Sequence, residues 1–423
     1  MSEWDGENLE KRRRIWLSSL EDPFRGQLLR SGCELPKRIF QCAPQPEGEP
    51  AFDPELITKR ALEIRLPPNA QFEHPLLERA VRVGLAHIDA TFEGDHPKYG
   101  VGHYAKNEHD SFPPTIIAAV DALTLWGMGS RAERLFSYWL RHFVREDGTI
   151  DYYGPSLSEY GQILTTARRL IDRGTGRDWL MIHEPFLSSI AGYLHQRLHE
   201  SERVSLVSGV PEADERESEA TYFHNNAWIV RGLEDWRYIL HTWLGRPDEA
   251  ENFQKDARAL RQELLDAIEL TWKEPNDWWL SPIVEKVHRP EGRITSNRIG
   301  SYTNYRYWPE LLSSCVLPRE KMIAIVKARL ESGGQFLGMT RFMDHLDDWP
   351  LAEYLEGLWQ LGFYDDYRLS LWGHICYHQE KEHLTAYEQV TLPPGHKVAD
   401  YCLPCQLVAA RAVYRLAMHA KGR

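Results

Sequence analysis

Residues 222–244 read Tyr-Phe-His-Asn-Asn-Ala-Trp-Ile-Val-Arg-Gly-Leu-Glu-Asp-Trp-Arg-Tyr-Ile-Leu-His-Thr-Trp-Leu. Apolar side chains recur every three or four positions in this stretch, at Ile229, Leu233, Trp236, Leu240 and Trp243. That spacing lines one face of an α-helix. The stretch therefore predicts a long helix packed on its apolar face.

The same period extends outward in both directions. Further predicted helices begin after Pro75 and at Pro113-Pro114, and cover about 130–145, 156–172, 178–198, 260–272, 319–331, 350–362, 366–378 and 404–420. Strand signals are sparse: Val204-Ser-Leu-Val207 and Val390-Thr-Leu392 are the best, and neither has a partner nearby in the sequence. We expect an all-α fold.

About a dozen helices in consecutive antiparallel pairs can close into a ring, with an inner layer of helices surrounded by an outer one. Closure hides the apolar edges that an open row of hairpins would expose. The longer loops then converge at one side of the ring on a central pocket. We expect residues 71–423 to form the ring and residues 1–70, rich in Pro and charge, to form an extension packed on it.

The charge balance excludes some partners. The net charge is -12 and the isoelectric point is near 5.9, whereas binding to nucleic acid and to anionic membranes depends on Lys and Arg. No apolar run reaches the roughly 20 residues needed to span a bilayer. We expect a cytoplasmic protein that binds neither nucleic acid nor membrane; the oligomeric state is left open.

Metal and redox motifs are weak. The six cysteines are too scattered for a disulfide framework. Cys402-Leu-Pro-Cys405 has the spacing of a redox or half-zinc motif, but no second Cys pair accompanies it. No HExxH motif occurs either. We expect no metal and no cofactor.

Aromatic residues are numerous, with 15 Trp and 19 Tyr. Many of them lie beside Gly, Pro, Asn and Asp in predicted loops. Flat apolar rings with polar tips suit the apolar faces of pyranose rings, while polar neighbours bind the hydroxyls. The loops therefore favour a carbohydrate as the ligand.

The first of these loops ends at His109-Asp-Ser-Phe112. Asp110 or Ser111 can simply cap the following helix. Alternatively, Asp110 accepts hydrogen bonds from sugar hydroxyls, with His109 and Phe112 beside it. A second loop, Asp147–Gly154, contains two tyrosines and is either a bare connection or part of the binding surface.

A third loop, 208–219, is acidic and leads into the helix of residues 222–244. Glu212 and Asp214 follow Gly209 and Pro211 in a constrained turn, whereas the later acids suit a solvated face. The helix start places His224 and Asn225 where they can face the same pocket.

Two more segments complete the predicted loops. Ser301–Pro309 holds Tyr302, Asn304, Tyr305, Arg306 and Trp308, and is either a binding wall or a core aromatic cluster. Its polar residues argue against a dry core, because buried polar groups without partners are costly. The last segment joins Arg341–Trp349, where Asp347 or Asp348 can cap a helix, to Tyr387-Glu-Gln389.

These motifs resemble the six-hairpin, (α/α)6-toroid glycosidases, especially the branch of trehalases, glucosidase-I-type enzymes and glucoamylases. His109-Asp-Ser-Phe112 resembles that branch's Trp-Asp-Ser-Phe segment, and Ser208-Gly-Val-Pro-Glu212 resembles its Ser-Gly-Trp-Asp loop. Asn225-Asn-Ala-Trp228 is similar to its Asp-Leu-Asn-Ala helix. The chain departs from the pattern at His109, at the acid displaced by one residue to Glu212, and at Tyr305-Arg-Tyr-Trp-Pro309, which replaces Trp-Arg-Gly-Pro.

The resemblance implies an all-α (α/α)6 toroid and a glycoside hydrolase. Glu212, with Asp214 in reserve, becomes the general acid, and Glu388 becomes the base that activates water, giving inversion across a carboxyl separation of roughly 6.5–9.5 Å. Asp110 holds the sugar in the cleavage subsite. The remaining expected substrate-binding residues are His109, Phe112, His224, Asn225, Tyr302, Asn304, Tyr305, Arg306, Trp308, Arg341 and Tyr387.

Two other functions fit the same toroid. Sugar epimerases, isomerases and polysaccharide lyases use His or Tyr for proton transfer, and His109, His224, His345 and Tyr160 are candidates. A carbohydrate-binding protein without catalysis is the third possibility, since fold does not fix function. Arg306 and Arg341 leave open whether the sugar is neutral or acidic.

Overall fold

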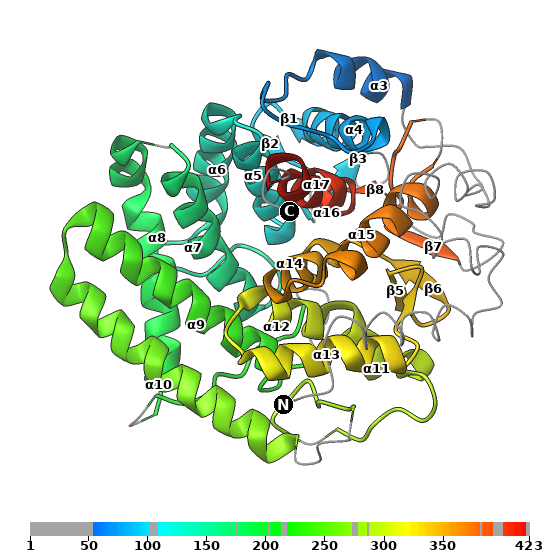
Figure 1. Ribbon diagram of the computed structural model, residues 1–423. Coiled ribbons are helices and arrows are strands. Elements are labelled where there is room, and N and C mark those ends of the chain that lie inside the picture. The colour runs from blue at the N-terminus through cyan, green and yellow to red at the C-terminus, as the bar shows by residue number, and fades with distance from the viewer. Residues whose placement is uncertain are drawn as a thin grey trace.

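The computed structural model describes residues 54–101, 109–174, 176–201, 204–212, 218–272, 278–285, 287–380, 383–391 and 401–419. Asp214, residues 1–53 of the predicted extension, Cys33 and Cys42 lie outside these residues. The described chain is a two-layered ring of helices, so the predicted all-α ring is confirmed. Figure 1 shows the helices following one another around the ring in chain order.

The inner layer consists of helices that are buried on almost every side. Every residue from Pro113 to Thr124 is buried, as is every residue from Leu157 to Ala167. Such helices need apolar or small residues all round, which the run Thr-Ile-Ile-Ala-Ala-Val of residues 115–120 provides. The inner helices are α5 (Pro113–Leu125), α7 (Leu157–Asp172), α9 (Phe223–Tyr238), α12 (Trp308–Ser314), α14 (Leu351–Leu361) and α17 (Val408–His419).

The outer layer includes amphipathic helices that bury one stripe and leave the other side to solvent. In α10 the buried positions Ala257, Leu260, Leu264 and Ile268 are spaced by three or four residues, as an amphipathic surface helix requires. The outer helices are α4 (Pro75–Thr91), α6 (Gly129–Phe143), α8 (Arg177–Leu198), α10 (Pro247–Thr271), α13 (Arg319–Glu331) and α15 (Tyr364–Gly373).

Neighbouring inner helices contact one another in the order α5, α7, α9, α12, α14, α17, and α17 returns to pack on α4 and α5. Short connections such as 126–128 and 362–363 lead from an inner helix to the next outer one. Long connections lead from each outer helix into the following inner helix, at 92–112, 144–156, 199–222, 272–307, 332–350 and 374–407. The long segments therefore precede the N-terminal ends of the inner helices.

Helices α7 and α9 approach so closely that their backbones touch. A Cβ added at Gly161 would lie 2.0 Å from the carbonyl oxygen of Trp228. One added at Gly232 would lie 2.5 Å from the Cα of Gly161. Only glycine fits at these two positions, because real Cβ atoms keep more than 3.0 Å from such neighbours.

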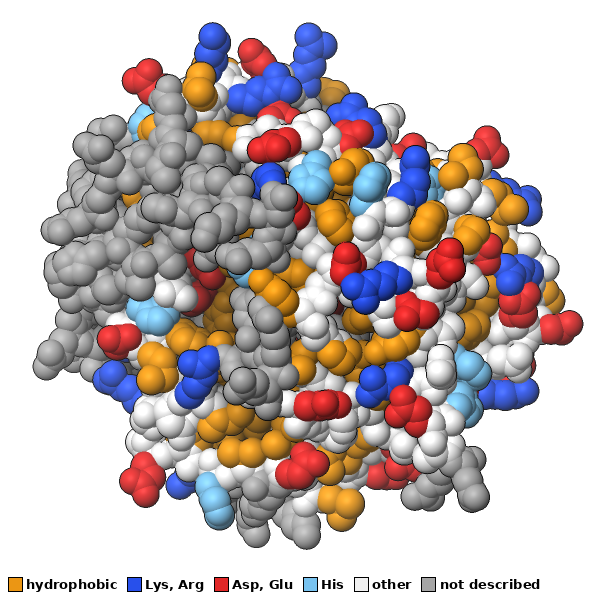
Figure 2. Space-filling model, turned by 180° about the vertical axis from the view of Figure 1, so that it is seen from behind, with side chains coloured by type: hydrophobic (Ala, Val, Ile, Leu, Met, Phe, Trp, Pro, Cys, Tyr) orange, Lys and Arg blue, Asp and Glu red, His pale blue; other side chains and the backbone are white. Residues whose placement is uncertain are grey.

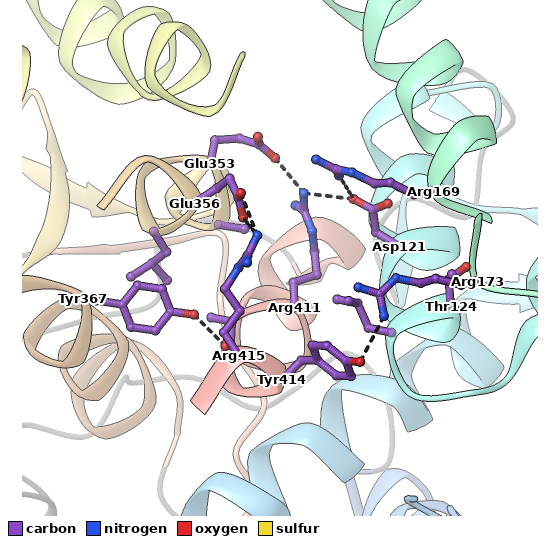
Figure 3. Close-up of a pocket in the computed structure, with 14 residues that line it drawn as sticks. Asp121, Thr124, Arg169, Arg173, Glu353, Glu356, Tyr367, Arg411, Tyr414 and Arg415 are labelled. Carbon is purple, nitrogen blue, oxygen red and sulfur yellow. Dashed lines mark hydrogen bonds and ion pairs between the residues drawn. The ribbon is translucent and has the colours of Figure 1, made fainter. Parts of the chain in front are cut away.

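Ion pairs join the inner helices where the ring closes (Figure 3). Arg411 of α17 pairs with Glu353 of α14 at 2.7 Å and with Asp121 of α5 at 3.4 Å. Arg169 of α7 also pairs with Asp121, at 2.7 Å. These residues line a cavity of about 140 Å³. The carboxylates and guanidiniums neutralise one another, so the network links four helices at the seam.

Short strands and helices occur within the long connections. Strand β5 (Met339–Phe342) pairs with β4 (Gln335–Phe336) and β6 (His345–Asp347), and β6 pairs with β7 (Gln389–Thr391). The strand signal at Val390 therefore finds its partner far away in the sequence, whereas residues 204–207 form no strand. The other small elements are β1 (Phe92–Glu93), β2 (His96–Pro97), β3 (Gly100–Val101), β8 (Tyr401–Cys402), the 3-10 helix η3 (Ile294–Ser296), α11 (Arg298–Tyr302) and α16 (Leu403–Gln406).

The prediction of a loop at residues 301–309 is wrong. Residues 298–314 form a nearly continuous helix, in which α11 passes through the π-helix η4 (Thr303–Tyr307) into α12. Pro309 is tolerated because it occupies the first turn of α12. Two further π-helices form the C-terminal ends of the predicted helices 222–244 and 366–378: η2 (Ile239–Leu244) after α9 and η5 (His374–His378) after α15.

The surface carries charges of both signs. Figure 2 shows acidic and basic side chains interspersed with apolar ones over the face opposite to that of Figure 1, unlike the continuous basic stripe of nucleic-acid-binding domains. Among the described helices, none combines the length and apolar character of a membrane-spanning segment. Helix α3 (Pro54–Glu63), in the predicted extension, packs on α4.

The glycine contact generates a stability prediction. Gly232→Ala should lower the free energy of unfolding by about 1–3 kcal/mol, because the added methyl group forces α7 and α9 apart. The measurement is urea denaturation followed by circular dichroism. Gly192→Ala on exposed α8 is the control: nothing lies within 4 Å of its added Cβ, so the stability should rise by about 0.5–1 kcal/mol. Equal effects of the two changes would contradict the close contact.

Candidate active site

The long connections meet at the N-terminal ends of the inner helices, and the candidate residues lie among them. Asp110 belongs to the connection before α5, Glu212 to the one before α9, and Glu388 to the one before α17. The structure thus joins chain segments separated by hundreds of residues. The Tyr99 hydroxyl, for example, donates a 2.8 Å hydrogen bond to Oε2 of Glu388.

Asp110 is not a helix cap. The N-cap of α5 is Phe112, which makes no side-chain capping bond, so the capping interpretation of Asp110 or Ser111 is wrong. Oδ2 of Asp110 instead lies 2.6 Å from Nε2 of His96 and accepts a 3.0 Å hydrogen bond from Lys98. Its Oδ1 is buried without a hydrogen-bond partner. A buried carboxylate oxygen without a donor is costly unless a ligand supplies one.

An aromatic cluster lines this end of the ring. Phe112 packs against Tyr99 at a ring-centroid distance of 5.2 Å and against Trp349 at 6.0 Å. Tyr305 packs against Trp349 at 5.9 Å. The cluster consists of buried Tyr99, Phe112, Tyr305 and Trp349, with Tyr152, Tyr302 and Phe342 partly exposed beside them. His109 joins it through a 2.7 Å hydrogen bond to the Tyr152 hydroxyl.

Arg306 is buried at the centre of three carboxyl groups. Its guanidinium lies 2.7 Å from Glu159 of α7, 2.7 Å from Glu310 of α12 and 3.3 Å from Glu212. Burial, helped by the negative charges of Glu310 and Glu212, raises the pKa of Glu159 to about 7 against the pull of Arg306. This group, the Arg306 cluster, therefore retains a proton on a carboxyl for part of the time at neutral pH.

Asp347 is a third acidic group, for which the sequence predicted only a possible role as a helix cap. It ends strand β6, is 2% exposed, and accepts a 3.1 Å hydrogen bond at Oδ2 from Gln389, its neighbour on β7. Its Oδ1 is buried without a partner. Burial, followed by the charge of Glu388, raises the pKa of Asp347 well above its usual range.

Tyr305 connects these acidic groups in space. Burial raises the pKa of its hydroxyl well above 10, and the charges of Asp347, Glu212 and Glu388 add to that effect. The charges of three carboxyl groups therefore act on one buried tyrosine. The structure brings together Glu212 and Glu388 from the sequence prediction and adds Asp347 to them.

Several predicted binding residues are occupied by bonds within the protein. Nε2 of His224 lies 3.1 Å from the carbonyl oxygen of Pro211, and burial lowers the pKa of this imidazole to about 3. Asn225 donates a 3.0 Å hydrogen bond to the carbonyl of Val210 and accepts one from the backbone of Ser158. Both side chains thus hold the turn that carries Glu212.

The segment around Asn304 is also scaffolding. The Asn304 amide donates to the carbonyl oxygens of Gly334 and Arg341 and accepts from Arg329. Arg341 donates to the carbonyl of Gln335. Trp308 lies in the main core and donates to the carbonyl of Leu280, and Tyr387 packs against Val390. These contacts support the aromatic cluster from behind.

Within the part of the chain that the structure describes, two groups of imidazoles and carboxylates have a spacing that suits a metal ion. Asp348, His374 and His378 form one of them, fully buried behind the site. Asp348 accepts hydrogen bonds from the backbone of Thr340 at 2.9 Å and from His374 at 3.0 Å, which are the partners that a buried carboxylate requires without an ion. The other group is His195, His199 and Asp256.

The comparisons with known proteins agree with this architecture. A wild-type glycosidase matches with a TM-score of 0.56 and 11% identity, over 82% of this chain and 99% of the other. The glucoamylase of Saccharomycopsis fibuligera matches with a TM-score of 0.56 and 10% identity, over 86% and 99%. An unsaturated glucuronyl hydrolase specific for heparin matches with a TM-score of 0.51 and 10% identity, over 82% and 97%.

No family model matches the chain, and no curated protein matches it in sequence. At 10–11% identity the solved structures show a shared fold. The long connections before the inner helices, and the ring that those helices close, are the same architecture that the sequence motifs predict. The chain therefore has the (α/α)6 toroid fold of the six-hairpin glycosidases.

Proposed function

We propose that the chain is a glycoside hydrolase that cleaves an oligosaccharide or glycoside with inversion, using Glu212 as general acid and Glu388 as general base. The supporting observation is that both carboxyl groups are joined to the aromatic cluster. Tyr99 donates a 2.8 Å hydrogen bond to Glu388, and Arg306, which pairs with Glu212 at 3.3 Å, lies 5.1 Å from the centre of the Trp349 ring. Hydrolysis with inversion needs one protonated and one ionised carboxyl on opposite faces of the sugar.

The Arg306 cluster supports Glu212 as the acid. Three carboxyl groups share one guanidinium, so their mutual repulsion favours retention of a proton that Arg306 alone would expel. Glu159 and Glu310 lie deeper, each side chain 3% exposed, whereas that of Glu212 is 11% exposed. Glu212 is thus the member of the cluster best placed to donate a proton to a leaving oxygen.

The surroundings of Glu388 support its role as the general base. Glu388 is partly exposed, and Tyr99 donates a hydrogen bond to one of its oxygens. Such a bond favours the ionised carboxylate. An ionised carboxylate at this position can accept a proton from the attacking water.

The open oxygens on Asp110 and Asp347 support sugar binding. Each carboxyl is buried, and each keeps one oxygen without a partner. Sugar hydroxyls are donors that would complete both groups, and the faces of Tyr305 and Trp349 would cover the apolar side of the ring. Asp347, held neutral by burial, can also donate a hydrogen bond to a hydroxyl.

The charges favour a neutral sugar. Arg306 is enclosed by three carboxyl groups, and Nε of Arg341 is bonded to a backbone carbonyl. These guanidiniums therefore do not resemble an open receptor for a uronate carboxylate. The ionised carboxylate proposed for Glu388 would repel such a group. A panel of neutral and uronic aryl glycosides should show turnover of the neutral ones.

Leaving-group dependence separates the three carboxyl groups. Glu212→Gln should lower kcat for alkyl glycosides by roughly 10²–10⁴-fold, but spare glycosyl fluorides, whose leaving group needs little protonation. Glu388→Gln should slow both substrates and be rescued by azide. Asp347→Asn should weaken kcat/KM for both substrates alike, because it acts in binding.

The control for these variants is Glu251→Gln, an exposed carboxylate on α10. Circular dichroism and the melting temperature check the folding of each variant, and NMR of the first-formed anomer checks inversion. If Asp347→Asn spares fluorides while Glu212→Gln does not, Asp347 is the acid and our assignment is wrong. Unaltered turnover in both Glu212→Gln and Glu388→Gln would reject the hydrolase mechanism.

The pH profile tests the Arg306 cluster. Loss of the shared proton should place the alkaline limb of kcat near pH 7, where Glu159 titrates. Glu159→Gln removes a negative charge beside Glu212, so the pKa of Glu212 should fall and the limb should move down by about 1 pH unit. kcat on the acidic side of the limb should stay nearly constant. A limb that stays in place, or rises, would show that the cluster does not set the protonation of the acid.

The alternative proton-transfer groups have less support. His224 and Tyr160 are buried, and the Tyr160 oxygen accepts a hydrogen bond from the backbone of Ile150. His109 and His345 both lie beside the aromatic cluster, with ring centroids 5.3 Å from Tyr99 and 5.4 Å from Phe342, respectively. NMR of the products distinguishes the reactions: a new reducing end indicates hydrolysis, a double bond indicates elimination, and unchanged chain length indicates isomerisation.

A further inference from the structure

A second group of chemically active side chains lies on the outer layer of the ring, on α8 and α10. Nδ1 of His195 lies 2.6 Å from Oδ2 of Asp256, and Nε2 of His199 lies 2.9 Å from Oδ1 of the same carboxylate. One ligand atom from each of the three residues lies within 4.8 Å of the others. The group is thus already gathered around one point.

The surroundings allow an ion to enter from solvent. The side chains of His195 and His199 are 46% and 40% exposed, whereas that of Asp256 is 8% exposed. The group borders a surface cavity of about 360 Å³, which Glu249 and Asn252 also line. The Asp256 carboxylate thus lies at the inner end of the group, and the two imidazoles lie at the surface, where an ion can reach them from solvent.

The spacing and the atom types point to a transition metal. His195 and His199 are four residues apart on one helix, so their rings project from the same face, as in zinc-binding His-x-x-x-His helices. Imidazole nitrogen suits Zn²⁺ and its neighbours in the first transition row, whereas Mg²⁺ and Ca²⁺ prefer oxygen ligands. Three protein ligands leave a fourth position for water.

We propose that His195, His199 and Asp256 form a binding site for a zinc-class divalent ion that clamps α8 to α10. The site lies next to the segment that carries the proposed acid. His199 is the C-cap of α8 and the first residue of connection 199–222, which includes Glu212. Arg197, between the two histidines, donates a 2.9 Å hydrogen bond to the carbonyl of Ser208 in the same connection. The ion fixes the root of that connection.

The alternative is a carboxylate that accepts hydrogen bonds from two imidazoles without an ion. The experiment titrates the tag-free, metal-stripped protein with Zn²⁺ by calorimetry, and with Co²⁺ by visible absorption. We expect one equivalent that binds at this site and raises the melting temperature. His195→Ala and His199→Ala should each weaken it more than about 100-fold, beyond the effect typical of outer-shell changes, while His241→Ala on exposed η2 should not.

The outcomes separate the two interpretations. Loss of one equivalent in both variants supports the site, even if another equivalent persists at Asp348, His374 and His378. Binding that is unchanged in His195→Ala and His199→Ala, or no binding to the unaltered protein, overturns it. Each variant removes one partner of the nearly buried Asp256 carboxylate, so its melting temperature without metal is measured as the baseline for any rise that the metal causes. The readouts are independent of glycoside turnover, so they stand whether or not the hydrolase proposal holds.

Discussion

The interaction on which the rest of the site depends is the pairing of the buried Arg306 guanidinium with three carboxyl groups. Glu159 comes from α7, Glu310 from α12, and Glu212 from a turn ahead of α9, so one side chain joins three parts of the ring. An isolated buried charge is costly. Because three carboxyl groups surround one cation, their mutual repulsion raises the proton affinity of the group. Structural cohesion and the protonation of the proposed acid thus have the same origin.

The direction of the inner helices reinforces this arrangement. Their N-terminal ends meet at the carboxylate-rich end, where the helix dipoles favour negative charge. Their C-terminal ends lie toward the opposite end, where Arg169 stands in the last turn of α7 and Arg415 near the end of α17. Arg415 pairs there with Glu356 at 2.6 Å. The two ends of the ring therefore differ chemically: acidic side chains gather at one end, and Arg–carboxylate pairs join the helices toward the other.

Periodicity made the helices and the ring predictable, because inner and outer helices both leave an apolar trace in the sequence. Residues 301–309 were mistaken for a loop, because the partners that satisfy the buried Asn304 lie in residues 329–341 and are invisible locally. Glu159 and Glu310 look like ordinary helix positions, since only the fold brings Arg306 between them. Asp347 ends a short strand whose partner is distant in sequence, so it resembled a helix cap. Glu212 stood out because it follows Gly209 and Pro211 in a constrained turn, and the resemblance of short motifs to a known family gave Glu212 and Glu388 their expected roles.

The closure of the ring also constrains its biosynthesis. Helix α17 packs on α4 and α5, and the carbonyl of Ala417 accepts a 3.0 Å hydrogen bond from the backbone of Gln71. During translation, at roughly 5–20 residues per second, the ribosome completes α4 and α5 long before it reaches α17. The apolar surfaces that α17 covers stay open throughout that interval. The nascent chain therefore exposes the apolar surfaces of α4 and α5 until its last helical hairpin is made.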